Sequence, residues 1–170
     1  TMHVYPTGDH GFGFGPWFKY HDLLLEDLGN WLKNLQTPKP DAIRVACIGN
    51  SITDGHGIEM ASQYGYPALL QKALGGDYWV KNFGVSGRTL LNKGDVPYMK
   101  EQAWRDEQAF QPDIAIIKLG TNDTKPQNWK YSSEFKQDLE QMIKALGHAK
   151  IFLCTPIPAF KDSWNINDSI

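Results

Sequence analysis

Short apolar runs alternate with amphipathic segments along most of the chain. The apolar runs are rich in Val, Ile, Leu or Phe, are bounded by Gly, Asn or Pro, and cover residues 44–48, 78–85, 113–119 and 150–155. Such runs are typical of strands that are covered on both faces. Between them, apolar residues recur at helical spacing over residues 66–74, 100–110 and 133–146. The order β-α-β-α-β-α-β predicts a parallel sheet with right-handed crossovers.

Two features bound these elements. Ser132 and Ser133 precede the clearest helix and Gly147 follows it, so we expect a serine cap at its start and a glycine at its end. Upstream, residues 17–35 predict one more amphipathic helix, which ends at the connector Thr-Pro-Lys-Pro. We therefore expect a tail at residues 1–36, a linker at 37–42 and an α/β domain at 43–170. The chain opens without an initiator Met, and we expect it to be a piece of a larger protein.

Composition narrows the possible partners. The 170 residues are 41% hydrophobic and 21% charged, enough for one domain with an attachment. A net charge of -2 gives no basic surface for nucleic acid, and no apolar run approaches the roughly 20 residues that cross a bilayer. Cys47 and Cys154 each lie in an apolar run, which favours reduced, packed thiols. We expect a soluble protein without a metal or cofactor, and the compartment, including a secreted or periplasmic one, stays open.

Residues that could take part in catalysis follow each of the first three predicted strands. The first strand is followed by Gly49-Asn50-Ser51, the second by a loop that contains Gly84, and the third by Gly120-Thr121-Asn122. Each loop alone can be read as a turn. Parallel strands open their loops at one edge of the sheet, however, and together these loops supply a hydroxyl, a glycine N–H and a side-chain amide. Those are the parts of an acyl-transfer site.

Three blocks carry a specific resemblance. IGNSITDG, KNFGVSGRTL and KLGTNDTKP resemble, in order and spacing, the first three blocks of the SGNH hydrolases of the GDSL esterase superfamily. The resemblance covers residues 43–158 and implies a three-layer α/β/α sandwich of flavodoxin-like type with strand order 2-1-3-4. It implies Ser51 as nucleophile and Gly84 and Asn122 as oxyanion donors. Asn50 stands where the commonest first block has aspartate, which puts the substrate range in doubt.

The fourth block of that family, Asp-x-x-His, is absent from these 170 residues. None of the five histidines follows an aspartate at that spacing, and His56, near Ser51, is expected to be a solvated loop residue. The resemblance therefore implies a missing last strand and helix, on a C-terminal segment that carries the general base. We expect the parent to hydrolyse a small acyl ester, with acetyl on a carbohydrate as the favoured substrate.

The first 36 residues resemble a different family. His10 lies in the glycine-rich turn GDHGFG ahead of a Trp-containing helix, as does the catalytic histidine at the C-terminal end of α/β-hydrolase esterases. On this interpretation His10 is the general base of a separate site, in a fusion of two esterases that removes acetyl groups from plant polysaccharide. The alternative is that the turn only caps the helix.

Weaker signals leave one rival function open. Asn122 and Asn167 match glycosylation sequons, which we take as incidental, and Ser86 lacks the surrounding pattern of a nucleophile. Trp129 and Trp164 could stack on sugars or simply pack. The rival is a non-catalytic carbohydrate-binding or scaffolding domain that kept the fold and lost the base.

Overall fold

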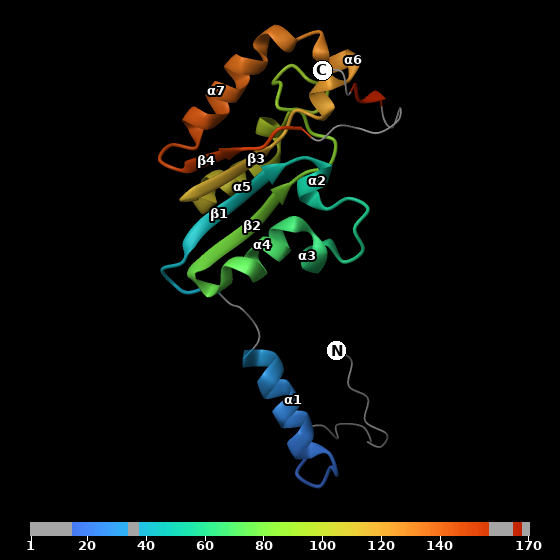
Figure 1. Ribbon diagram of the computed structural model, residues 1–170, viewed down its shortest axis with the longest axis vertical. Coiled ribbons are helices and arrows are strands. Elements are labelled where there is room, and N and C mark those ends of the chain that lie inside the picture. Colours follow the sequence, from blue (N-terminus) through green and yellow to red (C-terminus); the bar gives the residue numbers. More distant parts are fainter. Residues whose placement is uncertain (1–14, 34–37, 157–164, 168–170) are drawn as a thin grey trace. The chain divides into compact units, whose positions relative to one another are not determined.

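The computed structural model describes residues 15–33, 38–156 and 165–167 (Figure 1). The chain divides into two compact units, Thr1–Thr37 and Pro38–Ile170. In the first, helix α1 spans His21–Lys33 and begins later than the predicted residue 17, and Leu23, Leu25 and Leu32 on it are exposed. His10 lies outside the described residues. Its assignment to a separate α/β-hydrolase site stays a prediction.

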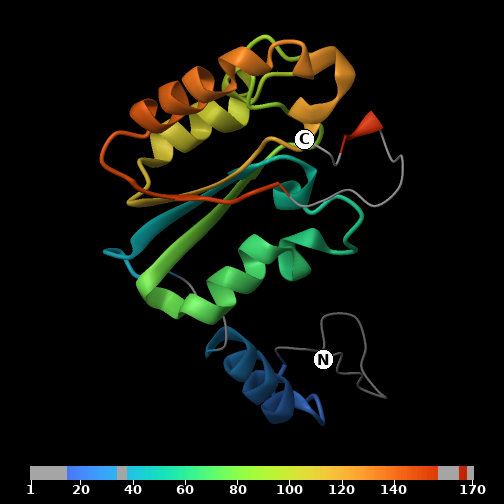
Figure 2. The same ribbon diagram turned by 45° about the horizontal axis from the view of Figure 1, so that its top comes forward.

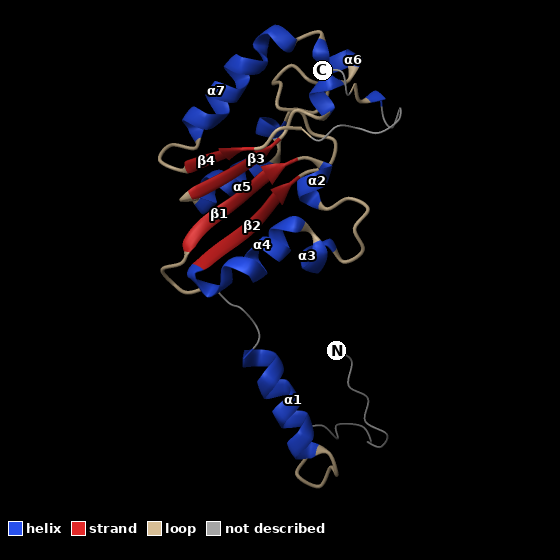
Figure 3. Cartoon of the chain, viewed as in Figure 1, coloured by secondary structure: helices blue, strands red, loops and turns tan. Residues whose placement is uncertain are grey.

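The second unit is built on a four-stranded parallel sheet in the order β2-β1-β3-β4 (Figures 1 and 3). Its strands are β1 (Ile43–Gly49), β2 (Tyr78–Gly84), β3 (Ile114–Lys118) and β4 (Lys150–Leu153). All three pairings are parallel, which confirms the predicted sheet and strand order. Gly49 pairs with Gly84 on one side and with Lys118 on the other, so β1, β2 and β3 end at the same level.

Helices cover both faces of the sheet (Figure 2). Helix α4 (Tyr66–Leu74) lies on one face, and α5 (Gln102–Phe110) and α7 (Phe135–Ala145) lie on the other. Short 3-10 turns, η3 (Tyr98–Lys100) and η5 (Ser132–Glu134), precede α5 and α7. The predicted serine cap is therefore wrong, because the serines form a turn of their own and the N-cap of α7 is Glu134, which makes no side-chain cap bond.

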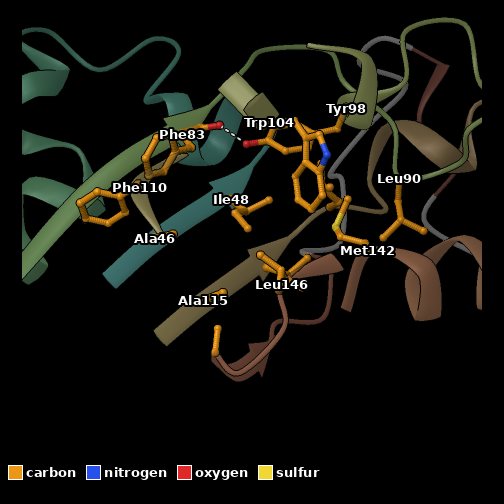
Figure 4. Close-up of a cluster of buried hydrophobic side chains, with 13 residues drawn as sticks. Ala46, Ile48, Phe83, Leu90, Tyr98, Trp104, Phe110, Ala115, Met142 and Leu146 are labelled. Atoms are coloured by element: carbon orange, nitrogen blue, oxygen red, sulfur yellow. Dashed lines mark hydrogen bonds between the residues drawn. The ribbon is translucent and has the colours of Figure 1, made fainter. Parts of the chain in front are cut away.

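The main core lies between the sheet and helices α5 and α7 (Figure 4). It contains alternate strand residues that face these helices, such as Ala46, Ile48, Ala115 and Ile117, all fully buried. The hydroxyl of Tyr98, also fully buried, donates to the Phe83 carbonyl at 2.5 Å and so satisfies its only polar group. Full burial of one large apolar side chain is worth roughly 1.5–3 kcal/mol. The many buried side chains of this layer therefore hold the strands, and with them the loops at their ends, in place.

Several short elements were not predicted. They are α2 (Ser51–Asp54), α3 (Ala61–Tyr64), η2 (Gly75–Asp77), η4 (Asn122–Thr124) and α6 (Pro126–Trp129). Residues of the expected linker belong to the second unit, since the Lys39 N–H donates to the Gly76 carbonyl at 2.9 Å. At the other edge of the sheet, Phe152 and Leu153 of β4 are 48% and 56% exposed. Within the described residues, no helix has the length and apolarity to cross a membrane.

Candidate active site

The turn from β1 into α2 places Ser51 at the first position of a helix, half-buried at the carboxyl edge of the sheet. Asn50 is 1% exposed, and its side-chain oxygen accepts the Ile52 N–H at 3.2 Å while its carbonyl accepts from Thr53 and Asp54. An N-cap needs only this acceptor, so asparagine serves it as well as aspartate. A β-carbon at Gly49 would overlap the Thr53 side chain, so only glycine lets α2 begin so soon after the strand.

Ser51 has no general base among the described residues of the second unit. His148 precedes β4, which places it at the opposite end of the sheet. His56 is exposed in the loop after α2, as expected, and its own backbone N–H donates to the Ser51 carbonyl at 2.9 Å. No side chain in the described part of the chain hydrogen-bonds to the Ser51 hydroxyl, although a serine needs a base within reach to act as a nucleophile at neutral pH.

The backbone N–H of Gly84, predicted as an oxyanion donor, already has another hydrogen-bond partner in the structure. Alternate N–H groups of a strand point to opposite sides, and the Val85 N–H is the one that reaches β1, at 2.9 Å from the Gly49 carbonyl. The Gly84 N–H points to the outer edge instead and donates to the Asn82 side chain at 2.8 Å. Glycine is required there for packing, because a β-carbon would overlap the backbone of Thr53 and Asp54 in α2.

A second glycine, Gly87, lies in the loop between β2 and η3, where the three site loops are joined. Its neighbour Ser86 donates to the Asp54 carboxylate of α2 at 2.5 Å. Its other neighbour, Arg88, accepts the Asn122 side-chain amide at its backbone carbonyl, at 3.1 Å. Gly87 has φ +82° and open space around the position of a β-carbon. The sequence alone does not single out Gly87, because its position between Ser86 and Arg88 matters only through the contacts of these two residues with the other loops.

Asn122 is the first residue of η4, shortly after β3 ends at Lys118, and is 5% exposed. Its side-chain amide donates to the Arg88 carbonyl, and its backbone carbonyl accepts the side chain of the buried Asn128 at 2.9 Å. The structure thus brings the loops of Ser51 and Asn122 to one edge of the sheet and ties both to the loop of Gly87. The second amide hydrogen of Asn122 remains for a ligand.

Asp123 holds the loop between β2 and η3 in place through hydrogen bonds to the loop's backbone. Its fully buried carboxylate accepts the N–H groups of Leu91 at 2.7 Å and Leu90 at 3.1 Å. Burial raises the pKa of this carboxyl above its ordinary value, although the hydrogen bonds oppose the shift. We assign Asp123 a structural role, since its oxygens are committed to backbone donors.

Other residues considered in the sequence analysis do not belong to the group formed by Ser51, Gly87 and Asn122. The ring of Trp129 packs against Phe135 with centroids 6.1 Å apart, which favours packing over sugar stacking, and Trp164 lies outside the described residues. Cys47 and Cys154 are free thiols, as predicted. Within the residues that the structure describes, no group of three His, Cys, Asp or Glu side chains could hold a metal ion.

Comparison with known proteins decides the family. The model of the GDSL-like lipase/acylhydrolase family matches residues 47–169. The chain belongs to the GDSL-like lipase/acylhydrolase family. This confirms the resemblance of the three blocks and places all of them inside the matched region.

Relatives of this GDSL-like chain include an acetylxylan esterase of Xylanibacter ruminicola, 64% identical over 191 aligned residues. That alignment covers 100% of the chain and 40% of the relative, so the chain spans well under half of that protein. Among solved structures, an aryl esterase of M. smegmatis in its inhibitor-bound form shares 21% identity at a TM-score of 0.53, over 69% of this chain and 65% of that one. A carbohydrate acetylesterase family member from Sinorhizobium meliloti shares 23% at 0.50, over 68% and 63%. These two likenesses show the fold alone.

Proposed function

We propose that the protein is a serine esterase that hydrolyses small acyl esters, with acetyl esters of a carbohydrate as the favoured substrates, through an acyl-enzyme on Ser51. The observation that carries this proposal is the junction of three strand-end loops around a serine at the start of α2. Membership in a family of lipases and acylhydrolases supports the reaction class. The 64% identity to an acetylxylan esterase supports the acetyl group and the carbohydrate.

The chemistry follows from the positions of the donors. The Ser51 oxygen attacks the ester carbonyl and loses its proton to the base, and the carbonyl oxygen becomes an oxyanion. We assign its stabilisation to the N–H groups of Ser51 and Gly87 and to the second hydrogen of the Asn122 amide. Collapse of the intermediate expels the alcohol with a proton from the base, and water then releases the acid from Ser51 by the same steps. Gly87 replaces Gly84, whose N–H faces away from Ser51.

We further propose that the base is a histidine of an Asp-x-x-His pair on a C-terminal segment that adds a strand beside β4. The span of the chain on its acetylxylan esterase relative leaves room for such a segment. The exposed Phe152 and Leu153 of β4 support the position, since an unpaired apolar edge strand favours pairing. We call the chain together with this segment the extended protein.

Hydrolysis of p-nitrophenyl acetate by the two forms tests the proposal. We expect the 170-residue chain to be nearly inactive, because loss of the base of a serine hydrolase costs on the order of 10⁶-fold in turnover. The extended protein should hydrolyse the ester, and Ser51→Ala should abolish that activity. Full activity of the chain alone would contradict the missing base and direct attention to His56 or His10. Inactivity of both forms, with binding of carbohydrate retained, would favour the non-catalytic binding domain.

A further inference from the structure

A groove runs along β2 on the face that carries α5, away from the Ser51 hydroxyl. It has a volume of about 730 Å³, and its walls come from the edge strand β2, from the start of β1 and from α5. The side chains that shape its floor are Trp79, Lys81, Phe83 and Phe110, with Arg44 and Asp106 at its sides. The groove exists because β2 is the outermost strand and α5 covers only part of its face.

Aromatic rings dominate the floor of this β2 groove. The ring of Trp79 is 41% exposed and meets Phe110 edge-to-face with centroids 5.1 Å apart. Phe83 and Phe110 follow at 5.5 Å, and Figure 4 shows these two rings side by side. An exposed indole held rigidly by a second ring is a surface on which the apolar face of a sugar ring can lie, with little ordering cost.

A cation lies over the same rings. The Lys81 ammonium is 5.0 Å from the Phe110 centroid, 5.2 Å from Trp79 and 5.9 Å from Phe83. Three rings hold it in place by cation–π attraction. No carboxylate pairs with Lys81 within the described part of the chain, whereas Arg44 on the other wall already pairs with Asp113 at 3.4 Å. The groove therefore offers a positioned positive charge to a ligand.

The backbone of β2 disfavours a peptide as the occupant. An added strand would need the outward N–H and C=O groups of this edge, and side chains already hold three of them. Gln71 accepts the Val80 N–H at 2.7 Å and donates to the Tyr78 carbonyl at 2.9 Å. Asn82 accepts the Gly84 N–H at 2.8 Å. The exposed side chains that stay open to a ligand are Trp79 and Lys81.

The groove also leads toward the site. At about 3.3 Å per residue, β2 carries it roughly 16 Å from Trp79 to Gly84. Gly84, the lining residue at the end of β2, pairs with Gly49, so this end of the groove lies at the edge of the sheet where β1 leads into Ser51. A chain lying in the groove would thus point to the edge at which the ester is proposed to react.

We propose that the β2 groove binds a polysaccharide chain with a pendant carboxylate, a uronic acid-bearing segment, with a pyranose ring on Trp79 and the carboxylate on Lys81. This deepens the proposed function, on which the choice of a carbohydrate rests, and makes an acidic acetylated polysaccharide the substrate class. Binding in the groove and hydrolysis at Ser51 are separable, since the groove does not contain the serine.

Calorimetric titration of the 170-residue chain tests the proposal with two probes, a xylo-oligosaccharide that carries one uronic acid and the neutral oligosaccharide of equal length. Trp79→Ala should weaken binding of both by about tenfold, the effect of ~1.4 kcal/mol, and Trp79→Phe should restore part of it. Lys81→Gln should weaken binding of the acidic probe only, and added salt should have the same effect.

Matched controls use residues outside the groove. Trp17→Ala removes an 80% exposed tryptophan in the other unit, and Lys144→Gln removes an exposed lysine of α7; neither should change binding. In the extended protein, Trp17→Ala and Lys144→Gln should also keep the activity on p-nitrophenyl acetate. Failure of the wild-type chain to bind either probe would overturn the proposed binding of polysaccharide in the groove, and so would equal effects of Trp79→Ala and Trp17→Ala. Either result would leave the esterase proposal intact. Binding by the chain but not by the extended protein would also overturn it, since a protein segment would then occupy the groove.

Discussion

Asn122→Ala in the extended protein should lower kcat by roughly 10²- to 10³-fold with little change in KM, because an oxyanion donor acts on the transition state. The upper part of this range is expected from the structure. The side chain is 5% exposed, and its bond to the Arg88 carbonyl at 3.1 Å fixes the amide before substrate arrives. The same truncation leaves that carbonyl without its donor, which costs roughly 1–3 kcal/mol of stability. A domain stable by roughly 5–15 kcal/mol would remain folded, so the loss of rate is not a loss of structure.

The assay is initial-rate hydrolysis of p-nitrophenyl acetate over a range of substrate concentrations, with thermal denaturation of each variant in parallel. Gln127→Ala is the matched control, because it removes an exposed side-chain amide from α6, close in sequence to η4. It should leave kcat and KM near their wild-type values. A pure KM effect of Asn122→Ala would refute the oxyanion role and make the residue a substrate-binding group. A kcat loss matched by Gln127→Ala would refute it as well.

Three further predictions concern the 170-residue chain. Ile117→Ala should cost roughly 2–5 kcal/mol in urea denaturation and Leu153→Ala under about 1 kcal/mol, because these register partners are 0% and 56% exposed; equal costs would contradict the core as described. Burial raises the pKa of the Glu107 carboxyl, so its ionisation costs folding stability as pH rises above the ordinary value of 4.5. Glu107→Gln should therefore melt above the wild type near neutrality and lose that advantage below 4.5; a pH-independent difference would contradict it. Burial also raises the pKa of the Cys47 thiol to about 11, so iodoacetamide at neutral pH should modify it only after denaturation, as peptide mass spectrometry can show.

Periodicity predicted the sheet because its strands are short apolar runs bounded by turn residues and separated by amphipathic helical segments. Burial on both faces was expected for all four strands, but β2 and β4, at the edges of the sheet, have mostly exposed or half-buried residues. The first strand, expected at 44–48, spans Ile43–Gly49, and the helix expected at 66–74 begins and ends there. The strand order did not follow from the residues and came from the family resemblance. The starts of α5 and α7 were less predictable. The residues before them form the 3-10 turns η3 and η5, whereas propensity alone would place those residues in the helices.

Ser51 and Asn122 could be predicted as site residues because each follows a strand closely, a relation that can be read along one chain. The proposal of Gly87 needed the structure, because it depends on contacts between loops far apart in sequence, from Ser86 to Asp54 and from Asn122 to Arg88. The β2 groove could not be predicted from the sequence for a similar reason. Trp79 and Lys81 look like ordinary positions of a strand until its place at the edge of the sheet is known.

Capture of the acyl-enzyme tests the central claim most directly. The extended protein is mixed briefly with p-nitrophenyl acetate, quenched in acid, digested and examined by peptide mass spectrometry, with Ser51→Ala as the control. We expect the mass of one acetyl group on the peptide that contains Ser51, and none on that peptide in the variant. Rapid hydrolysis with the acetyl group on another residue, or with activity retained in Ser51→Ala, would contradict the assignment of Ser51 as nucleophile.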